Sequence, residues 1–215
     1  MKINTTTQLI AKEGWKYIFF VSVLFLLSLW LDFFSWVFFV ILIFTIYLFR
    51  NPERVPVEND DKAIFSPNDG SIINISKAKY IDGKDYTKIE IEKPLLEASL
   101  LRAPTKMSLD SIDRRHGLCL PISSLLNKKL GEKVTLTCKC DYDNFFINVK
   151  SGIFARKIEI FKTIRSLKLA QRFGFLVDGD IEFYLPLDFR VKVSIGDRVK
   201  AGESVLGYFA YKGNK

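Results

Sequence analysis

A long apolar run near the start of the chain limits what the protein can fold into. From Tyr17 to Phe49, 33 residues, the only charged residue is Asp32. A secretory signal peptide has a shorter apolar core and a small-residue cleavage site, so we expect this run to stay in the membrane. One spanning helix needs about 20 residues, so the run is too long for one straight crossing.

The position of Asp32 favours a helical hairpin. Dividing the run there leaves arms of residues 17–31 and 33–49, each about 22–26 Å long as a helix. The hydrocarbon core is about 30 Å thick, so each arm is slightly short. A hairpin tip at the far interface tolerates a charge and nearby Trp residues. A single long tilted helix is the alternative.

Positive residues flank both ends of the run. Lys12 and Lys16 precede the run, and Arg50 and Arg54 follow it. Under the positive-inside rule both ends lie in the cytoplasm. We therefore predict a membrane anchor over residues 1–50 and a cytoplasmic domain over residues 51–215.

The formal net charge of +8 bears on partners. A basic domain tethered to a cytoplasmic membrane face is attracted to anionic phospholipids. Basic charge also serves nucleic-acid binding. The aromatic residues, however, lie mainly in the apolar run and are not interleaved with basic residues, so we expect no nucleic acid.

Short alternating segments dominate the remainder of the chain. Turns rich in Gly, Asp, Asn and Lys separate them, which is typical of a β barrel or sandwich. The expected strands are residues 86–92, 133–140, 144–149, 156–161, 181–186 and 189–194. Only residues 94–102 and 121–130 could form helices. The predicted fold is mainly β.

The C-terminal stretch "VSIGDRVKAGESVLG" (193–207) resembles the strand-turn pattern of barrel-sandwich hybrid domains. We therefore expect a barrel-sandwich-hybrid-like soluble domain preceded by a transmembrane or membrane-embedded helical hairpin. Biotinyl and lipoyl carriers share that fold class. The lipoyl-like "DDKA" at 60–63 lies too close to the next turn to form a protruding tip, so a carrier is not expected.

The cysteines and the single histidine do not predict a metal site. Cys138 and Cys140 are one residue apart, whereas zinc sites usually space their Cys by two to four. They continue an alternating strand pattern with Val134 and Leu136. With Cys119 they make an odd number, which we expect to stay reduced in the cytoplasm. The lone His116 is interpreted as a loop residue.

Four stretches together resemble the phosphatidylserine decarboxylase family, especially its short membrane-anchored bacterial members. They occur in the family's order, with a loose region at 105–145. The stretches are "FRNPER" (49–54), "SPNDG" (66–70), "SGIFARKI" (151–158) and "RFGFLVDGDIEFYLP" (172–186). In the last, we expect residues 173–186 to form two strands joined by a tight turn at 178–180.

The resemblance implies a specific chemistry. Family members cut themselves at a Gly-Ser bond, and the Ser becomes an N-terminal pyruvoyl group. That carbonyl forms a Schiff base with phosphatidylserine and acts as an electron sink while carbon dioxide leaves. A Ser-His-Asp arrangement supports the self-cleavage. The implied setting is phospholipid metabolism at the cytoplasmic membrane of a bacterium.

Mapping the family motifs onto this chain leaves two of the three residues missing. The Asp corresponds to Asp69, although an Asp in "PNDG" also forms turns without any catalytic role. The His position falls on Ser99, which cannot act as a base near neutral pH as His can. The Gly-Ser pair falls on Gly179-Asp180, or on Asp178-Gly179 in the other register. An Asp side chain provides neither the ester nor a route to a pyruvoyl group.

The sequence therefore predicts a divergent family member without a pyruvoyl cofactor. We expect a non-catalytic, phospholipid-binding or regulatory pseudoenzyme. Arg102, Arg156 and Lys157 are the candidate headgroup contacts, because Arg binds phosphate bidentately. The expected partners are an anionic membrane and phosphatidylserine or an enzyme of phospholipid synthesis, and a homodimer remains open. The alternatives are an active decarboxylase with a noncanonical site and a membrane-tethered interaction domain.

Overall fold

The structure is a computed structural model. It describes residues 9–31, 34–58, 60–80, 82–118, 120–121, 124–155, 158–161 and 166–210. The chain divides into two compact units, Met1–Glu53 and Arg54–Lys215. The predicted boundary lay three residues earlier. Asp32, on which the two-arm prediction rested, lies outside the described residues.

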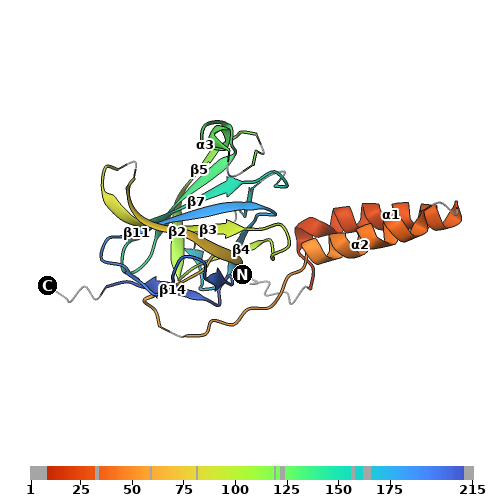
Figure 1. Cartoon of the computed structure of the whole chain (residues 1–215). Coiled ribbons are helices and arrows are strands. Elements are labelled where there is room, and N and C mark those ends of the chain that lie inside the picture. Colours follow the sequence, from red (N-terminus) through yellow and green to blue (C-terminus); the bar gives the residue numbers. More distant parts are fainter. Residues whose placement is uncertain are drawn as a thin grey trace. The chain divides into compact units, whose positions relative to one another are not determined.

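The first unit contains two apolar helices that lie side by side (Figure 1). A short 3-10 helix, η1 (Lys12–Gly14), leads into α1 (Trp15–Trp30), and α2 is Ser35–Leu48. The Phe25 and Phe39 rings lie 5.7 Å apart between their centroids. The segment Lys12–Trp30 is long and apolar enough to cross a membrane, whereas α2 is shorter. The apolar run thus forms two helices and not one, and α1 could anchor the protein to a membrane.

The second unit is mainly β, as predicted, and its described strands form three antiparallel sheets. The largest has eight strands in the order β13-β2-β3-β11-β7-β6-β5-β9; the others are β1-β14-β12 and β4-β10-β8. The strands are β1 (Ala63–Phe65), β2 (Gly70–Lys79), β3 (Asp85–Lys93), β4 (Leu100–Arg102), β5 (Met107–Arg115), β6 (Lys133–Lys139), β7 (Asn144–Ser151), β8 (Glu159–Ile160), β9 (Ser166–Leu167), β10 (Arg172–Phe175), β11 (Gly179–Pro186), β12 (Arg190–Val191), β13 (Arg198–Val199) and β14 (Val205–Tyr208).

Alternation along the central strands builds the core. One face of the large sheet is apolar and buried, because successive side chains on a strand point to opposite faces. Its members include Ile89, Ile91, Val134, Leu136, Cys138, Phe145, Ile147, Val149, Ile181, Phe183 and Leu185. The opposite face carries most of the charged residues of the same strands, and Lys93 at the end of β3 is an exception. The prediction that Cys138 belongs to a buried strand face is confirmed; Cys140 is half-buried.

Strand pairing defines one end of the large sheet. Gly179, the first residue of β11, lies opposite Lys93 at the end of β3 and opposite Ser151 at the end of β7. On the same side β6 begins at Lys133, which pairs with Arg115 at the end of β5. We call this the Gly179 end of the sheet.

Two local predictions are wrong. Residues 173–186 do not form a hairpin: β10 pairs with β4 and β8, whereas β11 pairs with β3 and β7. Residues 94–102 contain no helix; they form a connection ending in β4. In the other helical candidate, only α3 (Leu125–Leu130) is helical, with the Ser124 hydroxyl accepting a hydrogen bond from the Leu126 amide at its start.

Candidate functional site

The residues that resemble the family's reacting groups come from segments that meet at the Gly179 end. Asp69 directly precedes β2, whose Ser71 pairs with Glu92 near the end of β3. Ser99 precedes β4, and its carbonyl accepts a hydrogen bond from the Leu176 amide at 2.8 Å. Leu176 and the next two residues connect β10 to Gly179. The fold therefore gathers these separate motifs.

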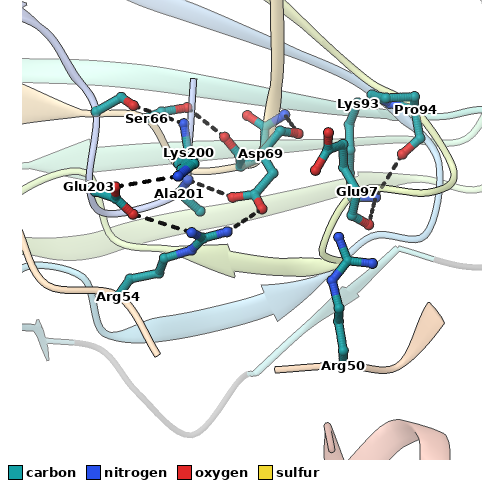
Figure 2. Close-up of polar contacts among 12 residues, drawn as sticks. Arg50, Arg54, Ser66, Asp69, Lys93, Pro94, Glu97, Lys200, Ala201 and Glu203 are labelled. Carbon is teal, nitrogen blue, oxygen red and sulfur yellow. Dashed lines mark hydrogen bonds and ion pairs between the residues drawn. The ribbon is translucent and has the colours of Figure 1, made fainter. Parts of the chain in front are cut away.

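Asp69 is buried and fully engaged in holding the chain together. Its side chain is 2% exposed. Oδ2 accepts a hydrogen bond from Arg54 at 2.6 Å, and Oδ1 accepts one from the Ala201 amide at 2.7 Å (Figure 2). Arg54 also contacts Glu203 at 3.2 Å. Asp69 thus joins three segments far apart in sequence, which sequence analysis did not predict.

Lys93 is a second buried charge that sequence analysis missed. Its side chain is fully buried. Nζ donates to the carbonyls of Val177 at 2.7 Å, Glu97 at 3.1 Å and Pro94 at 3.3 Å. These match the three N–H donors of an ammonium group. Figure 2 shows this cluster beside that of Asp69. The signal was present: Lys93 continues the inward alternation of Ile89 and Ile91.

The turn before β11 is held by Lys93 at Val177 and by the segment after β7 at Asp178. The Gly152 amide donates to the Asp178 carbonyl at 2.9 Å, and the Phe154 amide donates to Asp178 Oδ2 at 3.3 Å. At Gly179, where φ is +156°, a Cβ would lie 2.1 Å from the Lys150 carbonyl oxygen. Only glycine fits there, because such an approach to backbone cannot be relieved by a side-chain movement.

Asp180 is a buried carboxyl group on the charged face of the sheet. It is 8% exposed and lies between Glu92 on β3 and Lys150 on β7. Its Oδ1 has no hydrogen-bond partner among the described residues. Burial, reinforced by the nearby Glu92 charge, raises the pKa of Asp180 to about 7.

Glu182, two residues further along the same face, behaves oppositely. Burial alone would raise its pKa, but hydrogen bonds from Lys150 at 2.5 Å and Lys88 at 2.7 Å lower the pKa to about 2. The Asn148 amide also donates to it at 3.2 Å. The face therefore pairs a carboxylate that is ionised at neutral pH with one that exchanges a proton near neutral pH.

The turn does not fit the pyruvoyl group that the family resemblance implies. That group forms from the Ser whose own peptide bond breaks, and Asp178-Gly179-Asp180 contains no hydroxyl. Ser151, opposite Gly179, is buried, and its Oγ has no partner among the described residues. A hydroxyl on another strand could at most esterify the turn carbonyl; it could not become a new N-terminal pyruvoyl.

The predicted lipid contacts are placed only in part. Arg102 is 7% exposed, and Nη1 donates to the Ala170 carbonyl at 3.2 Å. Arg156 and Lys157 lie outside the described residues, as does Cys119. Where the chain is described, no group of three or more His, Cys, Asp or Glu side chains is arranged to hold a metal.

Asp180→Asn should stabilise the protein at alkaline pH. The folded pKa of about 7 lies above the ordinary value of 3.8, so the folded state binds the proton more tightly. Stability contributed by Asp180 therefore falls as pH rises from about 4 to 7 and stays low above that. We expect a gain of about 2–4 kcal/mol at pH 8 and little change near pH 4. Thermal unfolding in detergent measures this.

The matched control is Asp188→Asn, because Asp188 is exposed. It should leave the unfolding temperature unchanged at both pH values. An Asp180→Asn effect of equal size at both pH values would contradict the assignment of the titration to this carboxyl group.

Comparison with known proteins agrees with these motifs. A phosphatidylserine decarboxylase family model matches residues 41–207. A phosphatidylserine decarboxylase proenzyme of Desulfotalea psychrophila is 33% identical over 210 residues, covering 92% of this chain and 95% of the relative. That of Burkholderia cenocepacia is 28% identical, covering 95% and 98%. No solved structure matches. The chain belongs to the phosphatidylserine decarboxylase family.

Proposed function

We propose that this protein is a non-catalytic member of its family. It acts in phospholipid metabolism at a membrane, binding phospholipid or regulating an enzyme of phospholipid synthesis, and it neither cuts itself nor forms a pyruvoyl group. The observation that carries the proposal is the turn Asp178-Gly179-Asp180, which has no hydroxyl or thiol in either alignment with the family's Gly-Ser bond.

The contacts around the turn support the proposal. Lys93 binds the carbonyl before Asp178, and the segment after β7 binds Asp178 itself. Asp69, which resembles the retained member of the Ser-His-Asp arrangement, has both carboxylate oxygens occupied by Arg54 and Ala201. These contacts hold the turn on both sides.

One observation favours an alternative. The relatives are named proenzymes, and the buried Ser151 hydroxyl lies opposite Gly179. An active phosphatidylserine decarboxylase with a noncanonical site, converting phosphatidylserine to phosphatidylethanolamine, would have to employ such a group. We favour the non-catalytic function because Ser151 lies outside the bond that would break.

Intact mass spectrometry of the purified protein tests this. We expect one chain of 24.8 kDa, because the turn lacks a nucleophile on the scissile residue. Asp180→Ser creates a Gly-Ser pair but lacks the His, so it should remain mostly uncut. Asp180→Ser combined with Ser99→His should cut to a greater extent.

The control is Asp180→Ala combined with Ser99→His, which should stay whole. Cleavage of the unmodified chain, or carbon dioxide released by it from phosphatidylserine, would overturn the proposal. If Ser151→Ala abolished that activity, the alternative site would be identified.

Phospholipid binding predicts a headgroup-dependent gain in stability. A ligand that binds only the folded state raises the unfolding temperature with its concentration. Short-chain phosphatidylserine should therefore raise it, in detergent, more than phosphatidylcholine of the same chain length. Equal shifts with both lipids would favour a membrane-tethered interaction domain without a lipid site.

We further propose that the β unit faces the cytoplasm, since Lys12, Lys16, Arg50 and Arg54 flank the apolar helices. A protease added to intact spheroplasts should then leave a C-terminal epitope tag uncut, whereas lysis should expose it. Digestion of the tag before lysis would show the opposite orientation.

A further inference from the structure

Exposed apolar side chains gather at the Gly179 end of the sheet. Six of them belong to its connections, and each is more than half exposed. We call this set the apolar rim: Leu96, Leu118, Leu126, Leu130, Ile153 and Phe154. Large contiguous apolar surface on a folded domain marks a binding site, whereas scattered single residues do not.

The strand ladders place these connections together. Leu96 follows β3, the residues of α3 join β5 to β6, and Ile153 and Phe154 follow β7; those strands end or begin side by side at the Gly179 end. Hydrogen bonds link the connections as well. Asn127 donates to the Ser151 carbonyl at 3.2 Å, and the Phe154 amide donates to Asp178. Figure 1 shows α3 beyond the end of β5.

Among the described side chains of α3, the polar one is buried and the apolar ones are exposed. Its polar Asn127 is 5% exposed and donates to the Leu120, Pro121 and Ser151 carbonyls. Leu126 and Leu130, one turn apart, point outward. A surface helix normally buries its apolar stripe and exposes its polar one. The exposure of Leu126 and Leu130 beside a buried Asn127 favours an apolar partner for these two side chains.

We propose that the apolar rim inserts into the interface of an anionic phospholipid bilayer. The chain enters the β unit at this same end, because Arg54 binds Asp69 beside the start of β2. Only residues 49–53 separate α2 from Arg54, a span of at most about 20 Å. The β unit thus cannot leave a membrane that holds the apolar helices.

Charge supports this choice of partner. The chain has a formal net charge of +8, and the sequence of α3, LLNKKL, contains two lysines. Apolar side chains combined with basic residues are characteristic of segments that lie in the interface of anionic membranes. The docking deepens the proposed phospholipid binding by naming its surface, and it depends on the membrane anchor and not on the loss of self-cleavage.

Depth-dependent quenching of a fluorophore tests the docking in the full chain. In a background with Cys119→Ser and Cys140→Ser, single labels are placed at Leu126→Cys, Phe154→Cys and Leu187→Cys. Cys138 is buried and should not react. Leu187 is 50% exposed and follows Pro186 at the opposite end of β11, so it is a matched control.

The labelled protein is reconstituted into vesicles of phosphatidylcholine and phosphatidylglycerol whose acyl chains carry bromine. Interfacial insertion predicts at least about twofold stronger quenching at 126 and 154 than at 187, and weaker quenching there without phosphatidylglycerol. Circular dichroism matching the parent protein confirms that each labelled variant is folded.

Equal quenching at the three positions would overturn the docking. So would weak quenching at 126 and 154 accompanied by cross-links between copies through these cysteines, which would assign the rim to a second copy. Self-cleavage detected by intact mass would overturn the proposed function without changing the quenching result, so the two failures are distinguishable.

Discussion

The structure of the second unit depends on the absence of a side chain at Gly179. A Cβ there would lie 2.1 Å from the Lys150 carbonyl oxygen, so any other residue would push β11 away from β7. Since β11 lies between β3 and β7 in the middle of the large sheet, that displacement would pass to both neighbours. The turn that precedes Gly179 is positioned by the same close approach, with Lys93 on one side and Gly152 on the other.

Buried charge organises the same end of the domain in two ways. Asp69 and Arg54 form an ion pair that links the start of the unit to the segment around Glu203. Breaking a buried pair by removing one partner is costly, because the other charge is left without compensation. The ammonium group of Lys93 instead donates hydrogen bonds to backbone carbonyls. Asp69 thereby links segments distant in sequence, and Lys93 holds the Val177 carbonyl of the turn.

The sequence predicted some parts of this architecture well for a physical reason. Strand β6, and β3 from Lys88 to Glu92, alternate polar and apolar residues, which expresses the burial of one face directly. In β7 and β11 the alternation is interrupted at Phe146 and Tyr184, and β11 is buried on both faces. The supposed hairpin at 173–186 failed because local pattern identifies strands but not partners. Here β10 and β11 join different sheets. The partner of β10 is β4 and a partner of β11 is β3, and both partners lie more than 60 positions earlier in the chain.

The candidate site was predictable only as a set of motifs. The resemblance indicated Asp69, Ser99 and the turn, and the fold brings their segments to one end of the sheet. The contacts that decide their roles, those of Arg54 and Lys93, involve partners distant in sequence. Burial of Asp180 could not be inferred either, because it depends on the neighbouring strands.

The central place of β11 has a consequence for any cut at the turn. The fragment beginning at Asp180 would contain β11 to β14. In it β11 would remain hydrogen-bonded between β3 and β7, and β14 between β1 and β12. Such a fragment would remain with the rest of the molecule as a tightly held second subunit. A nicked protein would therefore migrate as one particle under native conditions, and only a denaturant would separate its two pieces.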